Sequence, residues 1–191
     1  VVEKVDGRRI DRFCREEIFD PLDMPDTRFE VEPHMAGRLA SVSIRGEDGR
    51  FANFELAPPS NPEFYGMGHA LDGRRILGEA GIAAMLGNQI GDLPVVGLKS
   101  AVPALSADLE LFPGHRKSHS MAFMRFEEDI PGMRSAGSQG WAGVLNSHYW
   151  FDPTANAIGL LMTQSLPFAE PRFMATYEKF EHATYRHLQA R

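Results

Sequence analysis

The pattern that most constrains the fold lies between residues 139 and 188. The stretch QGWAGVLNSHYWF at 139–151 predicts one long strand, DPTAN at 152–156 a turn, and the apolar run AIGLLMTQ at 157–164 a second, covered strand. A helix is predicted after Pro171, with one face formed by Phe173, Met174, Tyr177, Phe180, Thr184 and Leu188. Two strands followed by a helix are typical of an antiparallel sheet packed against helices, which indicates an α/β (α+β) fold.

Further elements are predicted upstream of this region. Residues 8–20 place Ile10, Phe13, Cys14 and Ile18 on one helical stripe, and Pro21 ends that helix because the residue before a proline avoids the α region. Weaker patterns predict a strand at 39–44, a helix at 78–89 that Gly87 ends, brief strands within a loop at 92–120, and a strand at 121–126.

Composition excludes several classes of protein. The chain has 191 residues, 43% of them hydrophobic and 24% charged, so we expect one globular domain that buries about 70% of its unfolded surface. The net charge of −6 argues against nucleic-acid binding, and Arg8-Arg9 and Arg74-Arg75 are isolated pairs that we expect to be solvated turn charges. No apolar run has the length of about 18 residues that a membrane span requires. A cytoplasmic location is favoured, although VVEKVDG at the start resembles a helix interior.

Cysteine and histidine give little support for a metal or cofactor site. Cys14 is the only cysteine, and we expect a buried, inert thiol. His115 and His119 in HRKSH have the four-residue spacing of a helical metal pair, but Pro113-Gly114 precede them and no third ligand is evident. A surface loop is therefore favoured over a metal-dependent hydrolase, and no metal and no cofactor are predicted.

Motifs for covalent catalysis are absent from the sequence. There is no phosphate-binding glycine loop, no Gly-x-Ser-x-Gly elbow and no Ser-x-x-Lys. One stretch nevertheless suggests a reactive site, because Gly140, Ala142 and Gly143 leave the strand nearly bare around Trp141. Glycine weakens a strand unless something approaches its backbone closely. That partner is either a substrate at an exposed edge or simply a tightly packed neighbour, and spacing alone does not separate the two.

Longer motifs resemble one known family. They are PGMRSAGSQGWAGVLNSHYWFDPTANAIGLLMTQSLPFAEPRF at 131–173, DRFCREEIFDPLDMPDTRF at 11–29, NPEFYGMGH at 61–69, ALDGRRIL at 70–77, MLGNQIGDLPV at 85–95 and LKSAVPALSADLELFPG at 98–114. In this collinear order they resemble the serine hydrolases of the class C β-lactamase and penicillin-binding-protein-like family, and most of all its family VIII carboxylesterase branch. The resemblance implies the C-terminal portion of one β-lactamase/transpeptidase-like domain over residues 1–191.

The resemblance also implies roles for four residues. Trp141, Ala142 and Gly143 match the Trp-x-Gly that replaces the Lys-Thr-Gly motif of β-lactamases, so they are expected to line the substrate pocket. The backbone N–H of Val144 is expected to help form the oxyanion hole. Without the motif lysine, a small ester or amide substrate is favoured over a β-lactam carboxylate. No catalytic role is carried over to His148.

Several departures from the family pattern limit what this chain can do alone. The Ser-x-x-Lys nucleophile motif and the Tyr-x-Asn/Ser motif are absent, and at the 69/70 junction a helix of the family pattern is missing, either deleted or unobserved. The main hypothesis is a serine hydrolase that acts through a covalent acyl-serine ester. This chain would supply the pocket wall, be inactive alone, and depend on the N-terminal portion of the domain or on a partner chain. The alternative is a non-catalytic binding or interaction module.

Overall fold

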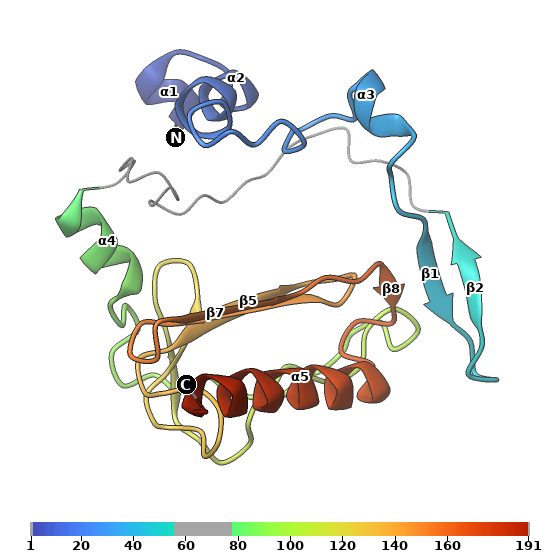
Figure 1. Ribbon diagram of the computed structural model, residues 1–191, viewed down its shortest axis with the longest axis vertical. Coiled ribbons are helices and arrows are strands. Elements are labelled where there is room, and N and C mark those ends of the chain that lie inside the picture. Colours follow the sequence, from blue (N-terminus) through green and yellow to red (C-terminus); the bar gives the residue numbers. More distant parts are fainter. Residues whose placement is uncertain (1, 56–77, 191) are drawn as a thin grey trace. The chain divides into compact units, whose positions relative to one another are not determined.

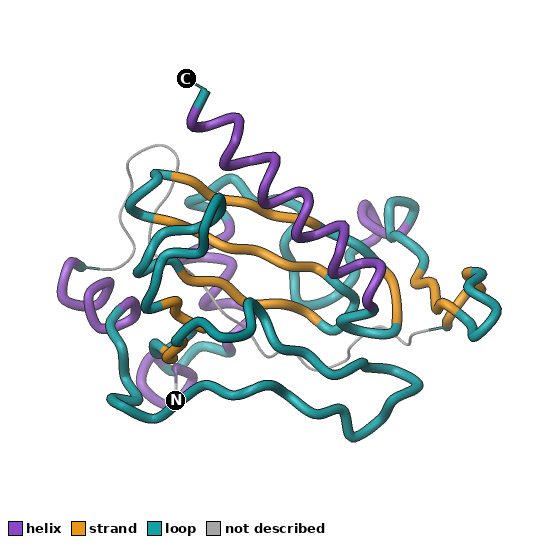
Figure 2. Tube along the Cα trace, turned by 90° about the horizontal axis from the view of Figure 1, so that it is seen from below, coloured by secondary structure: helices purple, strands orange, loops and turns teal. Residues whose placement is uncertain are grey.

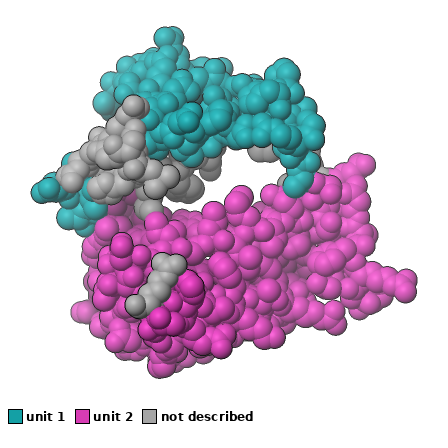
Figure 3. Space-filling view, viewed as in Figure 1, with its two compact units in different colours: residues 1–40, 56–83 teal, residues 41–55, 84–191 magenta. Residues whose placement is uncertain are grey.

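The computed structural model describes residues 2–55 and 78–190. The chain divides into two compact units, residues 1–40 with 56–83 and residues 41–55 with 84–191 (Figure 3). That both units belong to one domain stays a prediction. The 69/70 junction, the motifs at 61–69 and 70–77, and Arg74-Arg75 lie outside the described residues. No helix within the described ranges is long and apolar enough to span a membrane.

The first unit contains short helices, namely α1 (Val2–Asp6), α2 (Ile10–Cys14), the π-helical turn η1 (Arg15–Phe19) and α3 (Pro33–Ala36). The helix predicted at 8–20 is confirmed as α2 continuing into η1, and it ends two residues before Pro21. Cys14 is buried, as expected. Phe19, which lies outside the predicted stripe, is buried as well, whereas Ile18 of the stripe is only half-buried. Helix α4 (Glu79–Leu86) confirms the helix predicted before Gly87.

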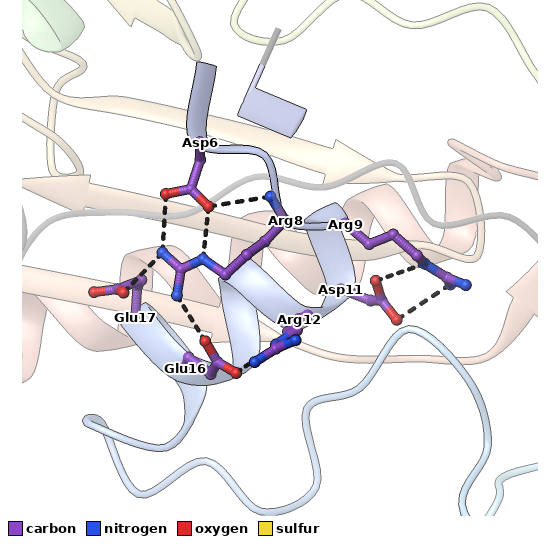
Figure 4. Close-up of polar contacts among 7 residues, drawn as sticks. All are labelled: Asp6, Arg8, Arg9, Asp11, Arg12, Glu16 and Glu17. Carbon is purple, nitrogen blue, oxygen red and sulfur yellow. Dashed lines mark hydrogen bonds and ion pairs between the residues drawn. The ribbon is translucent and has the colours of Figure 1, made fainter. Parts of the chain in front are cut away.

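Arg8 organises the charged surface of the first helices (Figure 4). Its guanidinium donates to Asp6 at 2.6 Å, to Glu16 at 2.6 Å and to Glu17 at 2.9 Å. These hydrogen bonds lower the pKa values of Asp6 and Glu16, with Arg12 the largest cause at Glu16. Arg8 is thus a member of a surface ion-pair network, rather than the isolated solvated charge that its sequence context predicts.

The second unit is built on a five-stranded antiparallel sheet in the order β3-β4-β5-β6-β7. Figure 1 labels β5 and β7 of this sheet. Its strands are β3 (Lys117–His119), β4 (Met124–Phe126), β5 (Gln139–Gly143), β6 (Ser147–Asp152) and β7 (Ala157–Leu161). A smaller sheet has the order β2-β1-β8, with β1 (Val42–Arg45), β2 (Phe51–Phe54) and β8 (Ser165–Leu166). The predicted strand at 39–44 therefore begins later, at Val42, and Leu39 is exposed.

The long strand predicted at 139–151 is wrong, because the chain folds back in its middle. A tight turn at 143–146 separates β5 from β6, and Asn146 N–H donates to the Gly143 carbonyl at 3.0 Å. Asn146 adopts a left-handed conformation, with φ of +60°, which asparagine tolerates better than most residues. Its buried amide also bonds the Pro167 carbonyl at 2.8 Å and the Ala169 N–H at 2.8 Å. Apolar Val144 and Leu145 prolong the strand pattern and conceal this turn.

Helix α5 (Pro171–Gln189) lies across one face of the large sheet, as the sequence predicts (Figure 2). Trp150 is fully buried against Tyr177 and Tyr185 of this helix. The predicted helix face is partly wrong, since Phe180 is 37% exposed whereas Glu181 is completely buried. A charged residue breaks the apolar periodicity, so the pattern did not include Glu181.

Glu181 is buried because Arg134 neutralises it. The guanidinium donates to both carboxylate oxygens, at 2.7 and 2.6 Å, and to the Tyr177 hydroxyl at 3.0 Å. Arg134 also lies over the rings of Phe126 and Trp150, at 4.7 and 5.5 Å from their centroids. The pair therefore fastens α5 to the loop before β5 and fixes the position of the sheet face beneath the helix.

Candidate functional site

Trp141, Ala142 and Gly143 lie on β5, where one edge of the strand is free of described strands. Strand β6 pairs along the whole of β5, whereas β4 pairs only with Gln139 and Gly140. Among the described residues, the edge of β5 that continues beyond Gly140 therefore has no strand partner. Trp141 is 43% exposed there.

Two backbone hydrogen bonds show which groups point to this free edge. Phe126 N–H donates to the Ser138 carbonyl at 2.9 Å, so the even-numbered residues of β5 direct their backbone groups toward the β4 side. The Gly143 carbonyl points the opposite way, because it accepts from Asn146. By this alternation, the Ala142 N–H and the Val144 N–H point to the free edge. Within residues 2–55 and 78–190, nothing accepts a hydrogen bond from Val144 N–H.

Close packing requires a glycine at position 140 of β5 but not at position 143. A β-carbon at Gly140 would lie 2.4 Å from the Tyr149 carbonyl oxygen, so Gly140 is required by close packing of β6. A β-carbon at Gly143 would meet nothing nearer than 3.8 Å, so no internal contact requires that glycine. The packing explanation therefore holds for Gly140 and fails for Gly143. They also lie on opposite faces of the strand, and not on the single bare face that the sequence suggests.

A cavity of about 210 Å³ lies along the free edge of β5. Its lining residues come from β5, β4, the turn after β5, and two loops: Leu98, Ser106, Leu109, Leu111, Met124, Gly140, Trp141, Ala142, Val144 and Phe168. The structure thus brings Trp141, Ala142 and Val144 together in one wall, while Gly143 is not among the lining residues.

Sequence patterns did not identify the opposite wall of this cavity. The segment predicted at 92–120 as loop with brief strands contains the short strand β3 near its end, and its part beside the cavity forms two isolated bridges, Leu98 to Leu109 and Ser106 to Phe168. Ala107 N–H donates to the Phe168 carbonyl at 2.8 Å, and Phe168 N–H donates to the Leu105 carbonyl at 2.9 Å. Single bridges leave almost no periodic signal, and their partners lie far apart in the chain.

The histidines do not form a metal centre in the part of the chain that the structure describes. His119 lies on strand β3, not on a helix, and its ring contacts Trp141 edge-on with centroids 5.4 Å apart. No group of three metal-ligating side chains occurs among the described residues. His119 therefore supports the Trp141 side chain.

His148 lies behind the cavity wall. It is 1% exposed, pairs across the strands with Ala142, and packs among the rings of Phe168, Phe173 and Tyr177. Burial, assisted by the charge of Arg134, lowers the pKa of His148 to about 4. At neutral pH the imidazole is uncharged and forms part of the core beneath the site.

Comparisons with known proteins agree with this architecture. The Beta-lactamase family model matches residues 1–184. A variant of simvastatin synthase (LovD) from Aspergillus terreus superposes with a TM-score of 0.74 at 18% identity, over 100% of this chain and 53% of that protein. The unliganded enzyme gives a TM-score of 0.72 at 19% identity, over 96% and 51%. A penicillin-binding protein homolog from Caulobacter crescentus gives 0.52 at 18%, over 92% and 54%.

These likenesses establish the fold, and the chain spans about half the length of the solved structures that it matches. A search of curated proteins gave no significant match.

Proposed function

Because the chain belongs to the Beta-lactamase family, we propose that it forms one wall of the active site of a serine hydrolase of the carboxylesterase type. The observation that carries this proposal is the Val144 N–H, which points to the free edge of β5 beside an apolar cavity. A backbone donor in an apolar setting is what an oxyanion hole requires, because its hydrogen bond is strong where water is excluded.

The proposed reaction has two steps. A serine hydroxyl supplied from outside this chain attacks the carbonyl carbon of the substrate, the leaving group departs with a proton, and an acyl-serine ester forms. Water then attacks that ester and releases the acid. In both steps negative charge develops on the carbonyl oxygen, and the Val144 N–H donates to it. Trp141 and Ala142 position the substrate along the edge of the strand.

The chemistry of the site favours an ester or amide over a β-lactam carboxylate. By the resemblance, Trp141 stands where the β-lactamase motif has lysine, and none of the described residues that line the cavity carries a charge. A substrate carboxylate would therefore find no charged partner among these residues. A neutral substrate therefore suits this wall better.

The partner that supplies the serine is proposed to pack on the face of the large sheet opposite α5. There Ile158 is 79% exposed, Leu160 54% and the adjacent Met162 69%, an unusual density of apolar surface. Strand β7 is also the last strand of its sheet, so among the described residues its outer edge is unpaired. Since the matched structures are about twice as long as this chain, the remaining portion of the family fold is the proposed occupant.

A non-catalytic module is the second candidate, and one observation favours it. Ser-x-x-Lys and Tyr-x-Asn/Ser are both absent from the 191 residues. A chain that kept the sheet and lost the nucleophile would bind ligands along β5 without reacting. The two candidates differ in whether the intact gene product holds a reactive serine.

Labelling with a fluorophosphonate tests the proposal. We expect the intact gene product to be labelled at a serine outside the 191 residues, and these residues alone to remain unlabelled. Val144→Pro removes the backbone donor, and proline suits the second position of the turn at 143–146. It should slow labelling by about a hundredfold, as loss of an oxyanion donor does. Val144→Ala keeps the N–H and is the matched control. Absence of labelling in the intact product would favour the non-catalytic module, and labelling of the 191 residues alone would overturn the assignment.

A further inference from the structure

The second unit contains a cavity of about 340 Å³, which is lined by residues of β1, β2, β7, β8, α5 and the turns that adjoin them. Four apolar side chains of the lining, Phe51, Leu161, Leu166 and Phe173, form what we call its apolar wall. An apolar protein cavity of about 150 Å³ holds benzene, so this cavity has room for a hydrocarbon group of about eight carbon atoms. The lining shares no residue with the cavity beside β5.

Three side chains of the lining are charged, namely the positive Arg45 and Arg172 and the negative Glu170. The Glu170 carboxylate already accepts a hydrogen bond from the Phe173 N–H at 3.0 Å, at the beginning of α5. Its Oε2 atom lies 3.6 Å from Arg45 Nε, so it offsets part of one positive charge. One carboxylate therefore faces two guanidinium groups, and the lining keeps a net positive charge.

Arg45 and Arg172 reach the same turn from different elements. The Arg45 guanidinium lies over the Phe51 ring, 4.1 Å from its centroid, and its Nη1 donates to the Gly49 carbonyl at 2.9 Å. Nη1 of Arg172 lies 3.4 Å from the point that a β-carbon on Gly49 would occupy. The two positive charges are therefore close together, and like charges repel each other. An anion bound between them would offset this repulsion.

Both guanidinium groups have N–H groups that a ligand could use. Within residues 2–55 and 78–190, Arg45 Nε has no hydrogen-bond partner and the Arg172 guanidinium donates to no other residue. The threonine hydroxyls of the lining already have partners, because Thr176 donates to the Arg172 carbonyl at 2.9 Å. Thr163 donates to the Leu145 carbonyl at 2.7 Å. A guanidinium presents its N–H groups in a planar fork that matches the two oxygens of a carboxylate.

We propose that this cavity binds an amphiphilic carboxylate. The carboxylate lies between Arg45 and Arg172, and a hydrocarbon group of about eight carbon atoms lies on the apolar wall. Burial of the hydrocarbon group favours such a ligand over an inorganic anion, and the two guanidinium groups favour it over a neutral ester. The inference goes beyond the proposed function and does not rest on it, because it requires neither a reactive serine nor the free edge of β5.

Ligand titrations of the 191-residue chain test the inference. Amide resonances of ¹⁵N-labelled protein would be followed while octanoate, octanamide or acetate is added. We expect octanoate to shift the amides of Gly49, Arg172 and Thr176. Octanamide lacks the charge and acetate lacks the chain, so each should bind more weakly by about tenfold or more. Equal binding of either one, or no shift of these amides with octanoate, would overturn the inference.

A matched pair of arginine variants tests the contact with the carboxylate. Arg172 is exposed and its guanidinium donates to no other described residue, so Arg172→Gln should fold normally. It should weaken octanoate binding by about tenfold or more, as loss of a hydrogen bond to a charged group does. Arg116→Gln removes a guanidinium outside the lining, from a side chain that is 69% exposed, and should leave the affinity unchanged. Unchanged affinity in Arg172→Gln would contradict the assigned contact.

A second matched pair locates the cavity on α5. Thr176→Asp adds a negative charge to the lining at an exposed position, and it should weaken octanoate binding by about tenfold or more. Ala175→Asp adds the same charge at the preceding exposed position, outside the lining, and it should have little effect. Equal effects of both variants would contradict the assigned site, and retained amide dispersion shows that each variant is folded.

Discussion

The indole of Trp150 lies directly against Gly159 of the neighbouring strand. A β-carbon at position 159 would fall 2.0 Å from Cη2 of the ring, well inside any contact that real atoms make. The two residues are cross-strand partners in the β6–β7 ladder. This absence of a side chain lets the indole lie flat beneath α5, where it is fully buried and donates to the Tyr185 hydroxyl at 3.2 Å.

Gly159→Ala is therefore expected to destabilise the protein. The methyl group must displace a large, fully enclosed ring, and overpacking of this kind costs about 1–3 kcal/mol or more of unfolding free energy. Urea denaturation monitored by tryptophan fluorescence measures the change. Gly143→Ala is the control, because the nearest atom to its β-carbon would be the Ser147 carbonyl oxygen, at the ordinary contact distance of 3.8 Å. Equal stability of the two variants would show that the indole can move aside freely.

Breaking the buried pair of Arg134 and Glu181 is expected to lower the free energy of unfolding by more than Gly159→Ala does. Glu181→Gln keeps the shape of the side chain but leaves the guanidinium buried without a countercharge, which costs about 3–5 kcal/mol. The expected result is a clear drop in the denaturation midpoint. Asp108→Asn, which breaks the exposed pair with Lys99, serves as control and should leave the midpoint unchanged. A small effect of Glu181→Gln would mean that water reaches Arg134.

His148 predicts a dependence of stability on pH. Its folded pKa of about 4 lies below the ordinary value of 6.5, so the unfolded chain binds the additional proton between these values. Stability is therefore complete above pH 6.5 and falls as the pH decreases toward 4, by at most about 1.4 kcal/mol per pH unit. His148→Phe keeps an aromatic ring and should flatten this part of the profile. His187→Gln, at an exposed position on α5, should leave the profile as in the wild type. An unchanged slope in His148→Phe would assign the dependence to other groups.

The apolar face of β7 predicts self-association when its proposed partner is absent. Ile158→Lys combined with Leu160→Lys places charges on this exposed face, and should reduce both light scattering and binding of the dye ANS. Leu93→Lys changes an exposed leucine outside the sheet and should leave both signals high. If the double variant associates as strongly as the wild type, another surface is responsible.

Local patterns in the sequence predicted much of the second unit. Apolar patterns identified strand residues in β5, β6 and β7, and helical spacing identified α5. The continuous run at 157–164 also predicted a covered strand, but among the described residues Ile158 and Leu160 of β7 remain exposed. The patterns failed at Val144-Leu145-Asn146, where an apolar pair conceals a turn that the buried amide of Asn146 holds from distant loops. They failed also at Glu181, whose burial depends on an arginine that lies 47 residues away.

For the candidate site, too, some features could be predicted from the sequence and others are visible only in the tertiary structure. The sequence by itself determined the family resemblance, from which the roles expected of Trp141, Ala142, Gly143 and Val144 follow, because a long motif is a local property of the chain. Only the tertiary structure decided that close packing requires Gly140 but not Gly143, and that Leu98, Leu109 and Phe168 complete an apolar cavity. The physical reason is that a cavity wall and an unpaired strand edge arise from contacts between distant segments, which no local pattern records.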